Sequence, residues 1–105
     1  MVIDTVQNSI NFDRIEHDFG KIKKGGIIST KFIYNDKKPI RSIRESCLCL
    51  SHRKTQFLDR TEITVWWDTN KSTKKTYIYK SYKSLVLFFD DNTFQSLTLK
   101  AEIHE

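Results

Sequence analysis

Cysteine, proline and glycine are scarce in this chain of 105 residues, which holds two, one and three of them respectively. So few cysteines exclude a disulfide-dense small domain, and so little proline and glycine excludes collagen-like and proline-rich disordered chains. Long apolar runs are lacking as well. The longest, residues 85–89, is far shorter than the roughly 20 residues of a membrane-spanning helix. The composition therefore predicts an ordinary globular protein.

The chain is long enough for one hydrophobic core and too short for two, so we expect a single domain over residues 1–105. Its first ten residues have no basic start and lack the apolar stretch of about 7–15 residues that a signal peptide needs. We therefore expect no secretion by a signal peptide and no contact with a membrane.

Apolar and polar residues alternate with a period of two along much of the chain, and no long window keeps helical spacing. Residues 28–34 and 62–68 predict the strongest strands, because they are rich in β-branched and aromatic side chains. Residues 84–103 predict a terminal hairpin, with a turn at 90–92 in which Asn92 takes a positive φ. Seven or so such segments predict an all-β fold, an immunoglobulin-like antiparallel β-sandwich of about seven strands.

The first third of the chain predicts shorter elements. Residues 10–12 and 15–19 have the pattern of two short strands, followed by a turn built on residues 23–26. Pro39 cannot pair within a central strand. We expect it to mark the point where the chain crosses between sheets.

The middle of the chain is harder to assign. We expect residues 40–49 to be extended and residues 51–55 to form a polar connection. Residues 69–83 are unusually polar and too long for a simple turn. They predict an edge strand or a projecting arm.

The two cysteines, Cys47 and Cys49, are separated by one residue. In an extended chain such neighbours lie about 7 Å apart at Cα, too far for an easy disulfide, so we expect small, buried, unbridged thiols. A soft-metal site with His52 and a Cys/His nucleophile pair are the alternatives, and neither has a complete pattern. Adjacent His17 and Asp18 point to opposite faces of a strand, which indicates a turn or cap histidine. The sequence predicts no cofactor, no metal and no catalytic residue.

Basic residues outnumber acidic ones, 18 to 13, and the excess lies between residues 21 and 83. Lysines and tyrosines interleave there. Such a pattern suits a protein interface, because a tyrosine ring supplies contact area at low entropy cost; the alternative is stacking on single-stranded nucleic acid. We favour the interface, with these candidates: Lys74, Lys75, Tyr77, Tyr79, Lys80, Tyr82 and Lys83.

Two neighbouring tryptophans, Trp66 and Trp67, lie in the strand predicted at residues 62–68. Consecutive strand residues point to opposite faces. One ring should fill the core and the other should meet the surface, where an exposed tryptophan is a candidate interface anchor.

Motifs spread over nearly the whole chain resemble a Bacteroidetes family of immunoglobulin-like domains of unknown function, related to the ASH domains of abnormal-spindle protein and Hydin. The family's opening H-D-F-G pattern is matched by residues 17–20, and its S-C-G-C pattern by residues 46–49, where Leu48 replaces the glycine. The other matching positions are Ile22, Gly25, Phe32, Asn35, Pro39, Ile40, Ile63, Val65, Asp68, Leu97, Leu99, Lys100 and Ala101.

This resemblance implies a protein-interaction or scaffold module without catalytic activity. A small domain of this kind without a signal peptide, rich in lysine, asparagine and isoleucine, predicts a non-enzymatic auxiliary (decoration) capsid protein of a tailed bacteriophage. The expected partner is a major capsid protein, and the expected location is the virion or the cytoplasm of the producing bacterial cell. The alternatives are a cellular interaction module of a Bacteroidetes-like bacterium and a small single-stranded nucleic-acid binder.

Overall fold

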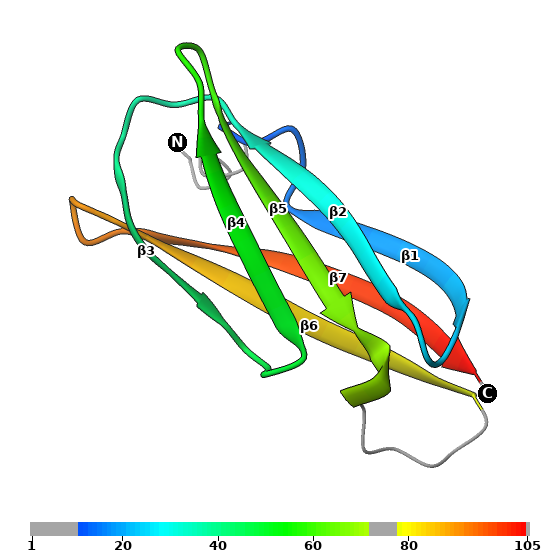
Figure 1. Cartoon of the computed structure of the whole chain (residues 1–105). Coiled ribbons are helices and arrows are strands. Elements are labelled where there is room, and N and C mark those ends of the chain that lie inside the picture. The colour runs from blue at the N-terminus through cyan, green and yellow to red at the C-terminus, as the bar shows by residue number, and fades with distance from the viewer. Residues whose placement is uncertain (1–10, 72–77, 105) are drawn as a thin grey trace, which may run out of the picture.

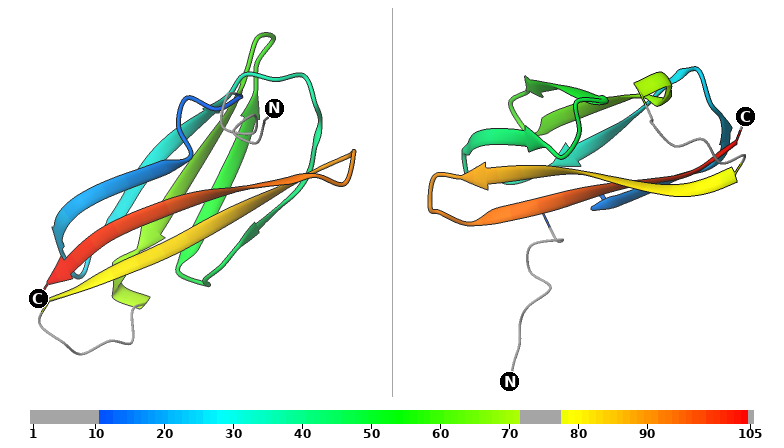
Figure 2. Two further views of the ribbon diagram at one scale, coloured as in Figure 1. Left: turned by 180° about the vertical axis from the view of Figure 1, so that it is seen from behind. Right: turned by 90° about the horizontal axis from the view of Figure 1, so that it is seen from below.

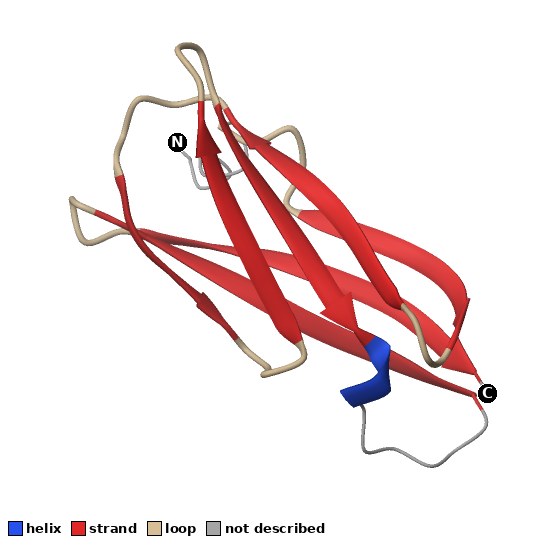
Figure 3. Ribbon diagram, viewed as in Figure 1, coloured by secondary structure: helices blue, strands red, loops and turns tan. Residues whose placement is uncertain are grey.

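The computed structural model describes residues 11–71 and 78–104, and they form two facing β-sheets (Figure 1). Seven strands make up the fold, and one short 3-10 helix, η1, is the single helical element among the described residues (Figure 3). The elements are β1 (Glu16–Lys23), β2 (Ile27–Tyr34), β3 (Ile40–Glu45), β4 (Leu50–Gln56), β5 (Thr61–Asp68), η1 (Thr69–Lys71), β6 (Ile78–Phe89) and β7 (Phe94–His104). No helix of this part of the chain is long and apolar enough to cross a membrane.

One sheet has four strands in the order β1-β7-β6-β3, and the other has three in the order β2-β5-β4. All neighbours are antiparallel except β1 and β7, the first and last strands, which run parallel. Viewed along the layers, the two sheets lie one over the other (Figure 2). The predicted all-β sandwich of about seven strands is confirmed.

Alternation of side chains explains the core between the sheets. In β5, every second residue is buried, and the residues between are half-buried. Strand β7 has the same pattern from Leu97 onward. Because each strand turns one face inward, both sheets supply aliphatic and aromatic side chains to the same layer. The fully buried large side chains are Phe32, Tyr34, Ile63, Val65, Trp67, Leu85, Leu87, Leu97, Leu99 and Ile103.

Several turns lie where the sequence predicts them. Asn92 has φ 70° in the turn between β6 and β7. Pro39 lies in the connection that carries the chain from β2 in one sheet to β3 in the other. Gly25, in the turn after β1, has φ 120°, a conformation that favours glycine. The hydroxyl of Thr69 accepts the Gly25 N–H at 3.0 Å, and this bond ties the turn to η1.

Three expectations about the strands between residues 10 and 56 are wrong. Residues 51–55 belong to β4 and are not a connection, because their main chain pairs along β5. The extended stretch predicted at 40–49 ends at Glu45, and the cysteines lie in a turn. Near the N-terminus one longer strand, β1, replaces the two short ones, and Phe12 forms only an isolated bridge to Tyr34.

The two tryptophans of β5 offer a matched pair of core and surface substitutions. Replacing Trp67, which is 1% exposed, with alanine should lower the free energy of unfolding by about 3–5 kcal/mol. Replacing half-buried Trp66 should lower it by about 1 kcal/mol or less. Urea unfolding followed by circular dichroism measures both, and Trp67→Phe serves if the alanine variant does not fold. Equal losses at the two positions would contradict the assignment of faces.

The turn between β6 and β7 gives a second, pH-dependent prediction. The carboxylate of Asp91 accepts the N–H and O–H of Thr93 and pairs with the Lys38 ammonium at 3.1 Å. The hydrogen bonds from Thr93, aided by Lys38, lower the pKa of Asp91 to about 2. A carboxyl whose pKa is lower in the folded state stabilises the fold above its unfolded pKa, near 4.

We therefore expect Asp91→Asn to destabilise the protein at pH 6, and the difference from the wild type to shrink as the pH falls from about 4 to 2. Unfolding free energies measured at several pH values test this. A difference that stays constant down to pH 2 would show that the carboxylate charge is not responsible.

Candidate protein-interaction surface

Trp66 lies on the outer face of the three-stranded sheet, and Trp67 lies in the core. On either side of Trp66 the strands place short serines, Ser29 of β2 and Ser51 of β4. The guanidinium carbon of Arg53 lies 5.8 Å from the centre of the Trp66 ring, within the range of a cation–π contact. An indole flanked by two small side chains leaves room around its ring.

A hollow of about 150 Å³ lies beside Trp66 and is lined in part by Ser51. Two large apolar side chains line it and remain exposed, Leu48 at 95% and Ile27 at 64%. Exposed apolar side chains that gather around a hollow mark interaction sites more often than scattered ones do. We call Ile27, Leu48 and Trp66 with this hollow the Trp66 surface.

The sequence names both tryptophans as candidates and misses Leu48 and Ile27. Trp67 is buried in the core and cannot be the surface anchor, which leaves Trp66. Leu48 is displayed by the turn between β3 and β4, where it lies between Cys47 and Cys49. The one feature of the sequence that could have indicated Leu48 is that it replaces a glycine in the S-C-G-C pattern. The role of Ile27 depends on the antiparallel pairing of β2 with β5, which sets it opposite Asp68 and next to the Ser29–Trp66 pair. The sequence alone does not specify that register.

Cys47 and Cys49 form a disulfide, contrary to the sequence-based expectation of unbridged thiols. The expectation rested on an extended chain, whereas the turn brings the two Cα atoms to 5.1 Å. Two hydrogen bonds close this turn. The Cys49 N–H donates to Cys47 Sγ at 3.0 Å, and the Leu50 N–H donates to the Cys47 carbonyl at 3.1 Å. The disulfide turn thus holds Leu48 outward.

The disulfide also removes the chemistry that the cysteines had suggested. Metal binding and nucleophilic attack both need a thiolate, and neither sulfur is a thiol here. The Nδ1 atom of His52 lies 2.5 Å from the Glu45 carboxylate instead. Within residues 11–71 and 78–104, no group of three or more potential metal-ligating side chains was found.

The lysine- and tyrosine-rich segment, residues 69–83, was predicted to be an edge strand or a projecting arm. Its last six residues are neither a separate edge strand nor an arm. Residues 78–83 form the start of β6, which pairs with β7. Lys80 and Tyr82 point to the outer face and are exposed, whereas Lys83 is half-buried and points to the inner face, in phase with Leu85. Lys74, Lys75, Tyr77 and the side chain of Tyr79 lie outside the described residues.

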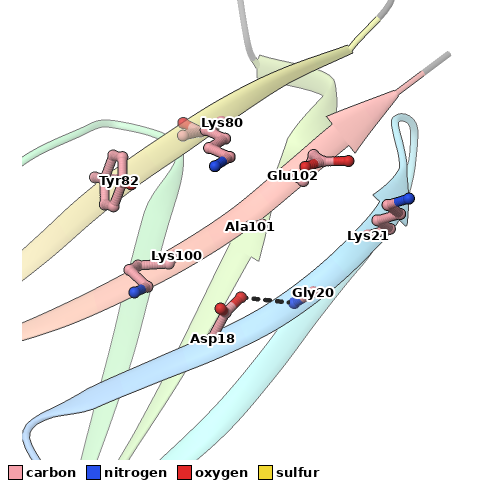
Figure 4. A pocket seen from close by; sticks show the side chains of 9 residues that line it. Asp18, Gly20, Lys21, Lys80, Tyr82, Lys100, Ala101 and Glu102 are labelled. Carbon is pink, nitrogen blue, oxygen red and sulfur yellow. Dashed lines mark hydrogen bonds between the residues drawn. The ribbon is translucent and has the colours of Figure 1, made fainter.

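A second hollow, of about 250 Å³, lies on the outer face of β1, β7 and β6 (Figure 4). Three lysines line it, Lys21, Lys80 and Lys100, together with the carboxylates of Asp18 and Glu102. The Lys100 ammonium pairs with Glu16 at 2.8 Å, and this contact raises the pKa of Lys100. Mixed charge and an already paired lysine do not make a binding site for an anion.

His17 lies within β1 and not in a turn or cap, which corrects the expectation from the sequence. Its ring meets the Phe19 ring edge-on at 4.5 Å, and its Nδ1 lies 3.3 Å from the Arg14 guanidinium. Burial and the nearby Arg14 charge lower the pKa of His17, opposed by Asp18. Asp18 itself is exposed and accepts the Gly20 N–H at 2.8 Å. The two side chains do not act as a pair.

Comparisons with protein families, curated proteins and solved structures gave no significant match for this chain.

The state of the cysteines can be tested directly. The native protein should take up no iodoacetamide under denaturing conditions and two equivalents after reduction, because its only two cysteines are joined. Replacing both with alanine should cost about 1–2 kcal/mol of stability, since the loop that the bond closes is very short. Mass spectrometry and urea unfolding measure the two effects. Two labels without reduction would contradict the disulfide.

Proposed function

We propose that this chain is a non-enzymatic protein-interaction module of the immunoglobulin type, and that it binds its partner through the Trp66 surface. Support for the fold type comes from strand order. In immunoglobulin domains the second, fifth and fourth strands form one sheet, and the third, sixth and seventh the other. The orders β2-β5-β4 and β3-β6-β7 follow this arrangement. Strand β1 departs from it, because the first strand of a constant-type domain lies in the sheet of the second, whereas β1 pairs with β7 in the other sheet. The sequence resemblance to ASH-type domains also supports an immunoglobulin-type fold.

The observation that carries the proposal is the exposure of Leu48 and Ile27 around the Trp66 hollow. Tryptophan and arginine are the side chains most enriched at binding hot spots, and here Arg53 lies against the Trp66 ring. No ion pair engages Arg53 in the described part of the chain. The fitting partner is therefore a protein surface with an apolar side chain for the hollow and a carboxylate for Arg53.

A more specific form of this proposal is that the chain is a capsid decoration protein of a tailed bacteriophage. Disulfides persist on virion surfaces and in other oxidising surroundings, which agrees with the Cys47–Cys49 bond. A cellular module of the same fold is the alternative. It would use the same surface, and mass spectrometry of purified virions separates the two. For the nucleic-acid alternative, the carboxylates that line the hollow beside Lys80 are unfavourable, because they repel phosphate.

Two fully exposed leucines allow a controlled test of the Trp66 surface. Leu48 lies beside the Trp66 hollow, whereas Leu58 lies in the turn between β4 and β5, at the opposite end of β4. A photo-crosslinking amino acid at position 48, in cells that produce the protein, should give a crosslink to one partner, and the same probe at position 58 should not. Adding Trp66→Ala should weaken binding to that partner about 30-fold or more, as expected for a hot spot of at least 2 kcal/mol.

Two results would contradict the Trp66 surface. One is a partner crosslink of equal strength from positions 48 and 58. The other is unchanged partner affinity in Trp66→Ala, with the folded state verified by circular dichroism.

A further inference from the structure

The four-stranded sheet has an incomplete edge. Strand β3 pairs with β6 only along residues 85–89, whereas β7 pairs with β6 along residues 78–88. Figure 1 shows β3 ending well before the yellow start of β6. Residues 78–83 of β6 therefore have a strand neighbour on one side only, and we call them the open edge.

The phase of the hydrogen bonds shows which main-chain groups the open edge presents. The Ser84 carbonyl accepts the Ser46 N–H at 2.9 Å, and the Ser84 N–H donates to the Ser46 hydroxyl at 2.9 Å. Both groups of Ser84 thus face β3 and not β7. Successive residues of a strand alternate in direction, so the N–H and C=O of Tyr82 and Lys80 face the same way. No described residue is hydrogen-bonded to them on that side.

The disulfide turn explains why β3 stops. After Ser46 the chain turns at Cys47–Cys49 and enters the other sheet, where the Cys49 carbonyl accepts the Asp68 N–H at 2.8 Å. Leu50 then pairs with Trp67. Strand β3 therefore does not run beside the first six residues of β6, residues 78–83, which precede Ser84.

We propose that the open edge binds an extended acidic segment of a partner protein, which adds to the sheet as a strand beside β6. Two N–H donors and two C=O acceptors, from Lys80 and Tyr82, match the pattern that an added strand completes. This site is separate from the Trp66 surface and does not depend on its function.

The charge of the open edge selects the occupant. Residues 78–83 contain two lysines, Lys80 and Lys83, and no acidic residue. Within the open edge, Lys80 lies on the outer face and Lys83 on the inner face, so an added strand meets a lysine on each of its faces. Glu102 lies opposite Lys80 on β7, but no ion pair joins them within the described residues. A second copy of this chain, pairing edge to edge, would bring like charges together, which is unfavourable.

Hydrogen exchange tests the geometry of the open edge without a ligand. The amides of Lys80 and Tyr82 should exchange much faster than those of Ser81 and Lys83, which point toward β7. Nuclear magnetic resonance resolves these four amides. Slow exchange at Lys80 and Tyr82 would show that the edge is already covered, and would overturn the proposal.

Binding of an added strand at the open edge can be tested with two octapeptides at millimolar concentration. In one, glutamate alternates with valine, and in the other, lysine alternates with valine. The glutamate peptide should slow exchange at Lys80 and Tyr82, and the lysine peptide should bind at least ten-fold more weakly. Equal binding of the two peptides, or no protection by either, overturns the proposal. If neither peptide protects the edge, the lysines of the open edge serve only to prevent aggregation through an exposed strand.

Matched variants locate the peptide. Lys80→Glu with Lys83→Glu should weaken the glutamate peptide about ten-fold. The control Lys37→Glu with Lys54→Glu changes the net charge equally at exposed residues outside the hollow that contains Lys80, and it should have a smaller effect. Tyr82→Pro removes an N–H that faces away from β7 and should abolish protection at Lys80. Trp66→Ala should leave peptide binding unchanged. Loss of peptide binding in Trp66→Ala would assign the peptide to the Trp66 surface and overturn the open edge.

Discussion

The structure depends on the burial of every second residue of β5 and β7 between two sheets. Val65, Trp67, Leu97 and Leu99 all lie in that layer with at most 1% of their surface exposed. A shift of either strand by one residue would turn these side chains to solvent and bring polar ones inside. The same constraint fixes the outer faces, because Trp66 must face out wherever Trp67 faces in. The candidate surface is thus a consequence of the core.

Where the two faces of a strand differ in polarity, the sequence was sufficient to predict the strand and its orientation. It predicted the sandwich, the opposite faces of Trp66 and Trp67, the crossing at Pro39 and the turn at Asn92, since each depends on local alternation or on one residue's backbone preference. The sequence-based prediction failed at β4, whose residues 51–56 are all polar. That strand is held by main-chain pairing with β5, which leaves no trace in the hydrophobic pattern.

The candidate surfaces were less predictable than the core, for a related reason. That one of the two tryptophans faces outward was predicted from the alternation of strand residues, but not that it is Trp66. Leu48 and the disulfide were missed because a turn, and not a strand, sets the separation of Cys47 and Cys49. The open edge was not predicted, because residues 78–83 were assigned to a separate edge strand or arm and not to the start of β6. Which residues are unpaired depends on where β3 stops, and this is a property of the assembled sheet.

One local feature connects the two surfaces. The disulfide turn ends β3, leaves the main chain of Lys80 and Tyr82 without a β3 neighbour, and presents Leu48 beside Trp66. A longer β3 would cover the open edge and carry the turn away from the Trp66 hollow. A shorter one would lose the bonds between Ser46 and Ser84 that join the end of β3 to β6. The length of one edge strand therefore determines what two faces of the molecule offer to a partner.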